Sequence, residues 1–268
     1  MAEDMVTLRR GRTPLLVSLP HVGTAIPGEF HDAFLPHALQ TEDTDWHLER
    51  LYAPFLDLGF GVLAPRVNRY VIDLNRPPDD TPMYPGAANT ELCPTHSFAG
   101  EPLYRDGAAP GPAEVARRRA TYWQPYHDAL AAELGRLRDE HGYALLWDGH
   151  SIHSRLPWLF DGTLPDLNLG TADGASCAPS LRAALAAVVA HVPDHTSIVD
   201  GRFKGGHITR RYGRPHEGVH AVQMEMTWRC YLAAEAPPFT YSDATAIRVQ
   251  PVLRRLLATM LAWRPDGR

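Results

Sequence analysis

Residues 143–151 read Tyr-Ala-Leu-Leu-Trp-Asp-Gly-His-Ser, an apolar run that ends in a cluster of polar side chains. A short apolar run of this kind, preceded here by Gly142, is typical of a buried β-strand. Because alternate side chains of an extended chain point to the same face, we expect Asp148 and His150 to point the same way. The functional groups of α/β folds gather just beyond the ends of their strands. The stretch therefore predicts a buried strand with a chemical site at its end.

Similar patterns on both sides of this stretch predict an alternation of strands and helices. Further strands are expected at 15–19, 61–64, 70–74 and 220–226, and helices at 43–58, 113–140, 180–192 and 244–263. Such alternation is typical of α/β proteins in which helices cover both faces of the sheet. The long segment 77–112, rich in proline and glycine, is expected to be a functional loop. We predict a single α/β domain over residues 1–268 with a mixed, mostly parallel sheet.

The composition argues against several classes of protein. The 26 Lys and Arg residues against 31 Asp and Glu give a net charge of −5, whereas nucleic-acid-binding domains are basic. No stretch reaches the run of about 18 apolar residues that spans a bilayer. Residues 1–5 are acidic and unlike a secretory signal, and the three widely spaced cysteines indicate a reducing compartment. We expect a cytoplasmic protein with a small-molecule substrate and no nucleic-acid or membrane partner.

A metal site is the first chemical hypothesis. There are 14 histidines, a high number, and two of them, His21 and His150, directly follow predicted apolar strand segments. A catalytic zinc ion takes three protein ligands and leaves one position open for water. The third ligand could come from the acidic cluster Glu42, Asp43 and Asp45, although acids at this place also suit the start of a helix. A histidine on a turn can equally well be bonded only to backbone. We expect one Zn²⁺ per chain, with another divalent ion as the alternative.

Two further segments suit an acidic substrate. The predicted strand at 70–74 leads into Asn75 and Arg76, and a guanidinium fork there could bind a carboxylate through two hydrogen bonds. The alternative is that Arg76 pairs with Asp73 or Asp79. The segment 201–211 combines glycines with cations before a predicted short helix, which suits an anion, but it lacks the phosphate-loop pattern.

Glu225 lies near the end of the apolar strand predicted at 220–226. A carboxylate is costly to bury unless it is paired with a cation or used as a base. Both interpretations, a buried ion pair and a general base, are open on the residues alone.

Taken in chain order, these motifs resemble those of the N-formylglutamate amidohydrolases, also called N-formylglutamate deformylases. The segments that carry the resemblance are 20–21, 44–47, 68–77, 92–95, 122–127, 146–151, 164–170, 201–206 and 218–223. That family is distantly similar to the zinc carboxypeptidases and aspartoacylases, so the resemblance implies a carboxypeptidase-like, phosphorylase/hydrolase-like fold. Thr24 stands where the carboxypeptidase pattern has an acidic second ligand. The family's own Thr-Asp-Trp motif favours Asp45 over Glu42.

The resemblance implies zinc-dependent hydrolysis of N-formyl-L-glutamate to formate and L-glutamate, the last step of a histidine-degradation route. The implied roles are zinc binding by His21, Asp45 and His150, proton transfer by Glu225, oxyanion stabilisation by Arg69, and binding of the two substrate carboxylates by Asn75 with Arg76 and by Arg202 or Arg210. Because a formyl group is small, Trp147, Trp158 or Phe160 is expected to close the pocket. The alternatives are a related metallo-amidohydrolase acting on another N-acyl amino acid and a non-catalytic ligand-binding homologue.

Overall fold

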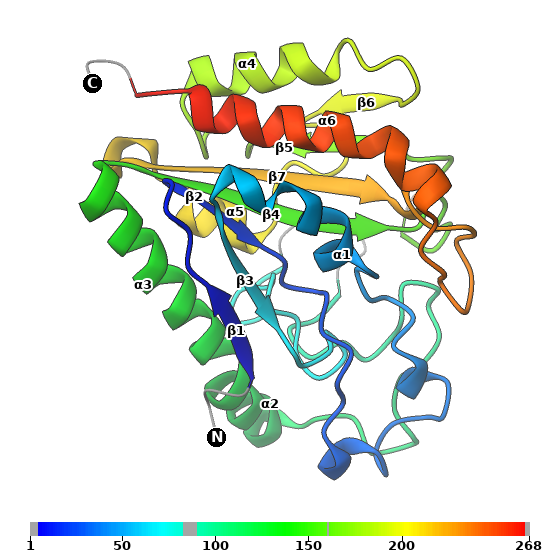
Figure 1. The fold of residues 1–268 in the computed structure, drawn as a ribbon. Coiled ribbons are helices and arrows are strands. Elements are labelled where there is room, and N and C mark those ends of the chain that lie inside the picture. Colours follow the sequence, from blue (N-terminus) through cyan, green and yellow to red (C-terminus); the bar gives the residue numbers. More distant parts are fainter. Residues whose placement is uncertain (1–4, 83–89, 160, 266–268) are drawn as a thin grey trace.

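A computed structural model describes residues 5–82, 90–159 and 161–265. Within them, seven strands form one mixed sheet in the order β1-β3-β2-β4-β7-β5-β6 (Figure 1). Their bounds are β1 Val6–Arg9, β2 Leu15–Ser18, β3 Gly61–Pro65, β4 Ala144–Ile152, β5 Leu167–Gly170, β6 Ser197–Val199 and β7 Val219–Thr227. The pairs β2–β3, β2–β4, β4–β7 and β5–β6 are parallel, and β1–β3 and β5–β7 are antiparallel. The predicted mixed, mostly parallel sheet is confirmed.

Helices cover both faces of this sheet (Figure 1). The α-helices are α1 Leu48–Tyr52, α2 Pro112–Arg118, α3 Gln124–His141, α4 Pro179–Val189, α5 His207–Tyr212 and α6 Asp243–Ala262. Short 3₁₀ turns lie at Gly28–Phe30, Ala38–Gln40, Ala53–Leu58, Pro215–Glu217 and Trp228–Cys230, and Arg119–Trp123 is a π-helical turn. None of the helices in the described ranges is both long and apolar enough to cross a bilayer.

The alternation along β4 divides the core in two. Leu145 and Trp147 pack with side chains of α1, α4 and α6, whereas Ala144 and Leu146 pack with α3. The two halves of the core lie on opposite faces of the sheet, because successive side chains of an extended strand point to opposite faces. The resulting architecture is one mixed α/β domain; that it takes in every residue of 1–268 stays a prediction.

Two predicted elements differ from the structure. The strand expected at 70–74 is a series of turns, because other bonds replace a sheet ladder. Asp73 N donates to Leu92 O in a distant loop segment (2.7 Å), and Asn75 N donates locally to Asp73 Oδ1 (2.8 Å). The helix expected from residue 43 begins only at Leu48, since Asp45 N donates to His21 O (2.9 Å) instead of to a helical carbonyl. Both departures bring polar residues towards the carboxyl ends of β2 and β4.

Candidate active site

The predicted site residues come together at the carboxyl edge of the sheet. His21 follows β2, His150 lies near the end of β4, and Glu225 lies near the end of β7. Strands β4 and β7 pair in parallel with His150 opposite Glu225. Parallel strands end at the same edge of a sheet, so their terminal side chains share one place.

The three predicted metal ligands form a compact triangle of donor atoms. His150 Nδ1 lies 3.2 Å from both His21 Nδ1 and Asp45 Oδ2, and His21 Nδ1 lies 3.7 Å from Asp45 Oδ2. A tetrahedral zinc ion with bonds of about 2.0–2.1 Å holds its ligand atoms roughly 3.3 Å apart. All three side chains are buried, and neither Glu42 nor Asp43 belongs to such a group among the described residues. The donor set therefore fits one divalent ion, and the geometry favours Asp45.

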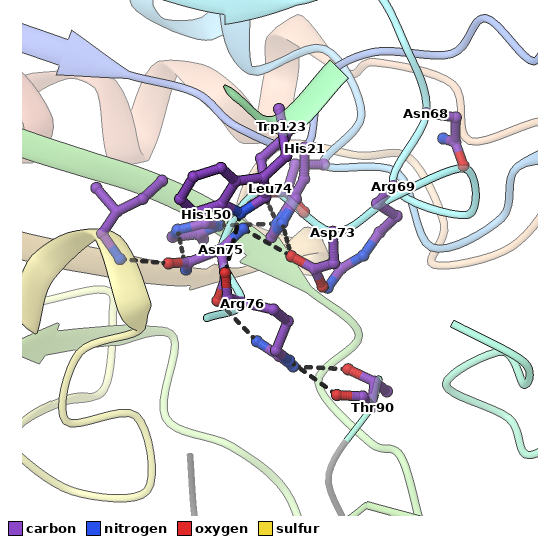
Figure 2. Close-up of polar contacts among 12 residues, drawn as sticks. His21, Asn68, Arg69, Asp73, Leu74, Asn75, Arg76, Thr90, Trp123 and His150 are labelled. Carbon is purple, nitrogen blue, oxygen red and sulfur yellow. Dashed lines mark hydrogen bonds and ion pairs between the residues drawn. The ribbon is translucent and has the colours of Figure 1, made fainter. Parts of the chain in front are cut away.

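The second nitrogen of each histidine ring faces a carboxylate. His21 Nε2 lies 2.7 Å from Asp73 Oδ1, and His150 Nε2 lies 3.1 Å from Asp148 Oδ1 (Figure 2 shows the first of these contacts). With Nε2 of His21 protonated and donating to Asp73, that ring presents its Nδ1 lone pair to the triangle. His150 presents its Nδ1 in the same way in the tautomer whose Nε2 donates to Asp148. The expected common direction of Asp148 and His150 is confirmed. The sequence indicates Asp73 only as an alternative partner of Arg76, and its contact with His21 is a finding of the structure.

The charges around the triangle favour a cation. Burial alone would lower the pKa of His150, but the Asp148 and Asp45 carboxylates raise this pKa well above its ordinary value. Burial and the Arg69 guanidinium together lower the pKa of His21, so its ring stays neutral. A bound metal ion would take the place of the proton that these carboxylates attract to His150.

Glu225 is buried beside this triangle, and burial raises its pKa to about 8, with the Asp45 charge adding to the rise. No described residue donates a hydrogen bond to its carboxyl group. Its backbone is held instead, because Asn168 Nδ2 on the neighbouring β5 donates to Glu225 O at 3.1 Å. A cation at the triangle would lower the pKa of Glu225. Among the residues that the structure describes, none forms an ion pair with the Glu225 carboxyl, so this group is able to exchange a proton.

Asp73 connects the triangle to Arg69. Arg69 Nη2 donates to Asp73 Oδ2 at 2.6 Å (Figure 2). The Arg69 guanidinium also lies 4.4 Å from the centre of the Phe98 ring. Burial alone would raise the pKa of Asp73, but the charges of Arg69 and His21 hold this pKa well below its ordinary value. The Asp73 oxygens bond directly to His21 and Arg69, and the Arg76 charge adds to the lowering of the Asp73 pKa without a direct ion pair among the described contacts.

Arg76 and Asn75 leave the same turn in different directions (Figure 2). Arg76 donates from Nε to Thr90 O (3.0 Å) and from Nη2 to Thr90 Oγ1 (2.7 Å). Asn75 lies with its Nδ2 3.0 Å from His150 Nε2, and its Oδ1 accepts from Ile208 N at 2.8 Å. A Cβ on Gly206 would lie 2.2 Å from Asn75 Nδ2, so only glycine permits this close approach. Asn75 is thus wedged between α5 and a predicted metal ligand.

The remaining predicted substrate-binding residues, Arg202 and Arg210, are exposed to solvent. Arg202 is exposed and donates to Leu159 O, and exposed Arg210 donates from Nε to Gly205 O at 2.8 Å. Which of the two meets a substrate carboxylate stays a prediction.

The aromatic residues expected to close the pocket differ in how far they are buried. Trp147 is fully buried and donates from Nε1 to Tyr52 Oη at 2.8 Å, so the prediction that it closes the pocket is wrong. The alternation that directs Asp148 to the site directs Trp147 to the opposite face. Trp158 is 45% exposed, and Phe160 lies outside the described residues.

A second group of potential ligands, Asp166, His195 and Cys230, differs in its chemistry. Arg229 Nε donates to Asp166 Oδ1 at 2.5 Å, and the other oxygen accepts from Thr196 N at 2.9 Å. Burial raises the pKa of Cys230 to about 12, which disfavours the thiolate that binds metal. This carboxylate is already satisfied by a cation, so the geometry favours one ion per chain at the first group.

Comparison with known proteins agrees with the geometry. The family model for N-formylglutamate amidohydrolase matches residues 13–232. The chain belongs to the N-formylglutamate amidohydrolase family. Within this family of amidohydrolases, it is 49% identical over 261 residues to an N-formylglutamate deformylase of Pseudomonas aeruginosa, and 48% identical to one of Pseudomonas putida, with 97% of each chain covered. A solved N-formylglutamate amidohydrolase from Ralstonia eutropha JMP134 is 25% identical with a TM-score of 0.79, over 96% of this chain and 97% of that one. The predicted resemblance and fold class are confirmed.

Proposed function

We propose that this chain hydrolyses N-formyl-L-glutamate to formate and L-glutamate with one zinc ion, as the last step of a histidine-degradation route in the cytoplasm. The observation that carries the proposal is the convergence of His21 Nδ1, Asp45 Oδ2 and His150 Nδ1, with separations of 3.2–3.7 Å, at a buried Glu225 paired opposite His150. The deformylase names of the Pseudomonas relatives support the choice of substrate.

The three converging atoms would hold the ion, while Asp73 and Asp148 fix the two rings from behind. When bound, zinc supplies a Lewis acid that polarises the formyl carbonyl and makes a water more acidic.

Glu225 is the group that moves the proton. It accepts a proton from the attacking water and passes this proton to the leaving nitrogen, first as a general base and then as a general acid. Its raised pKa suits the acid form, and a nearby cation shifts it back towards the base form. Arg69, held by Asp73, offers a fixed positive charge for the oxygen on which negative charge develops.

The substrate carboxylates need cations outside the triangle. Arg76 with Asn75 would bind one carboxylate next to His150, and Arg202 or Arg210 would bind the other. A charge-assisted fork of this kind fixes orientation as well as affinity.

A formate-release assay with purified protein tests the proposal. We expect hydrolysis of N-formyl-L-glutamate to stop when a chelator removes the metal and to return when zinc is added. N-acetyl-L-glutamate serves as the comparison substrate and should be hydrolysed more slowly. Equal rates before and after metal removal would overturn the zinc mechanism. Preference for the acetyl compound would instead favour a related amidohydrolase, and glutamate binding without formate release would favour a non-catalytic protein.

Replacing Arg76 with alanine should mainly weaken substrate capture. A charge-assisted fork contributes on the order of 1.5–3 kcal/mol, which corresponds to a rise in KM of about 10- to 150-fold. Steady-state kinetics measure KM and kcat separately. The matched control is R254A, which removes an exposed pair of hydrogen bonds from Arg254 to Asp57 and should leave KM unchanged. An unchanged KM in R76A would show that Arg76 does not bind the substrate.

A further inference from the structure

The segment Leu74-Asn75-Arg76, here called the strap, is anchored by two side chains of the helical layer. Trp123 Nε1 donates to Arg76 O at 3.0 Å, and His127 Nε2 lies 2.8 Å from Leu74 O (Figure 2 shows Trp123 beside the strap). No strand of the described sheet pairs with the strap. These two donors therefore bind backbone carbonyls of the strap, in place of the hydrogen bonds that the strand predicted at 70–74 would have formed with a neighbouring strand.

The tautomer of His127 follows from its partners. Because a carbonyl oxygen can only accept, His127 Nε2 carries the hydrogen, and Nδ1 is left to accept from Tyr212 Oη at 2.9 Å. Burial lowers the pKa of His127 to about 3, so the ring stays neutral. The Trp123 and His127 rings stack with centroids 3.7 Å apart and planes at 21°. The two donors thus form one rigid, buried unit.

The local helix geometry produces this unit. Trp123 is the last residue of the π-helical turn Arg119–Trp123, and His127 lies in the first turn of α3. Residues four apart on a helix lie on the same face, so both donors reach the strap together. Single π turns occur frequently at functional sites.

We propose that Trp123 and His127 are positioning residues for the carboxylate clamp formed by Asn75 and Arg76, which rests on the function proposed above. The two anchored carbonyls flank the Asn75 residue that contacts His150, and the Arg76 guanidinium extends from the residue whose carbonyl Trp123 holds. Releasing either carbonyl lets the peptide units of the strap rotate. The Arg76 guanidinium, bonded to Thr90 at its far end, then shifts relative to Asn75, while the triangle of His21, Asp45 and His150 keeps its own anchors.

Replacing Trp123 with phenylalanine keeps an aromatic ring and removes the indole N–H. We expect W123F to raise KM for N-formyl-L-glutamate about three- to tenfold, with kcat changed less than about twofold and one zinc per chain retained. The matched control is W263F, which removes the hydrogen bond of comparable length from Trp263 Nε1 to the exposed Ser180 Oγ (3.0 Å) and should leave KM unchanged.

A double-mutant cycle separates positioning from general stability. If Trp123 acts through Arg76, W123F should change KM less than about twofold in the R76A background. A second pair of variants tests His127: H127Q keeps an amide donor for Leu74 O and should retain a KM near that of the wild type, whereas H127M has no donor and should raise KM as W123F does.

Three results would overturn the proposal. The first is an unchanged KM in both W123F and H127M. The second is a W123F variant that raises KM by the same factor in the wild-type and R76A backgrounds. The third is a loss of zinc that accompanies the rise in KM. Wild-type protein that releases no formate would overturn the proposed function and this inference with it. Active wild-type protein with an unaffected W123F variant would overturn only the inference.

Discussion

Replacing Glu225 with glutamine is expected to lower kcat by about 10²–10⁴ while the protein keeps its zinc. The amide has the shape of the carboxyl but cannot take a proton from water. Because no described residue donates a hydrogen bond to this carboxyl group, the substitution breaks no network within the described ranges, and the fold should persist. Formate release at saturating substrate measures kcat, and elemental analysis of the dialysed protein measures the metal.

The matched control for this variant is E133Q. Glu133 is also a buried carboxyl, but it lies on α3 and is paired with Arg136 at 2.6 Å. We expect E133Q to lower the melting temperature and leave kcat unchanged, since it removes an ion pair far from the reacting atoms. An E225Q variant with the wild-type kcat would remove Glu225 from the mechanism. Loss of zinc from E225Q would instead assign it a role in metal binding.

The part of the site carried by regular strands could be predicted from the sequence. On β4 and β7, the period of two residues decides which side chains face the site, and it directs Asp148, His150 and Glu225 to one face. The same period directs Trp147 to the core. Trp147, one of three aromatic residues expected to close the pocket, is therefore excluded from that role, because its place in the alternation and not its size decides which face it joins.

The part carried by irregular backbone could not be predicted in the same way. Val71 and Ile72 are apolar and buried like strand residues, yet their segment turns, because Asp73 and Asn75 bond locally and the helical layer binds the strap. The partners of Asp73 lie 52 residues away at His21 and four residues away at Arg69. Such pairings depend on how distant segments of the chain meet in the fold. The pattern of residues close together in the sequence does not predict this.

Replacing His150 with alanine should abolish metal binding and hydrolysis together. The change removes one of the three atoms of the triangle and leaves Asp45 and Asp148 without the ring that separates them. The remaining side chains, Asp45, Asp148 and His21, no longer converge on one point and bind zinc far more weakly than the complete triangle. Dialysed H150A should therefore carry less than about a tenth of an ion per chain. Elemental analysis after dialysis measures this, alongside formate release and the melting temperature.

The control for this experiment comes from the second group of potential ligands. H195A removes a histidine from the group with Asp166 and Cys230, where Arg229 already occupies the carboxylate. We expect H195A to keep one zinc per chain and its activity, because Arg229 pairs with the Asp166 carboxylate and burial raises the pKa of the Cys230 thiol to about 12. If H150A kept full zinc and H195A lost it, the ion would belong to the second group. The paired histidines His21 and His150 would then need another explanation for their convergence 3.2 Å apart.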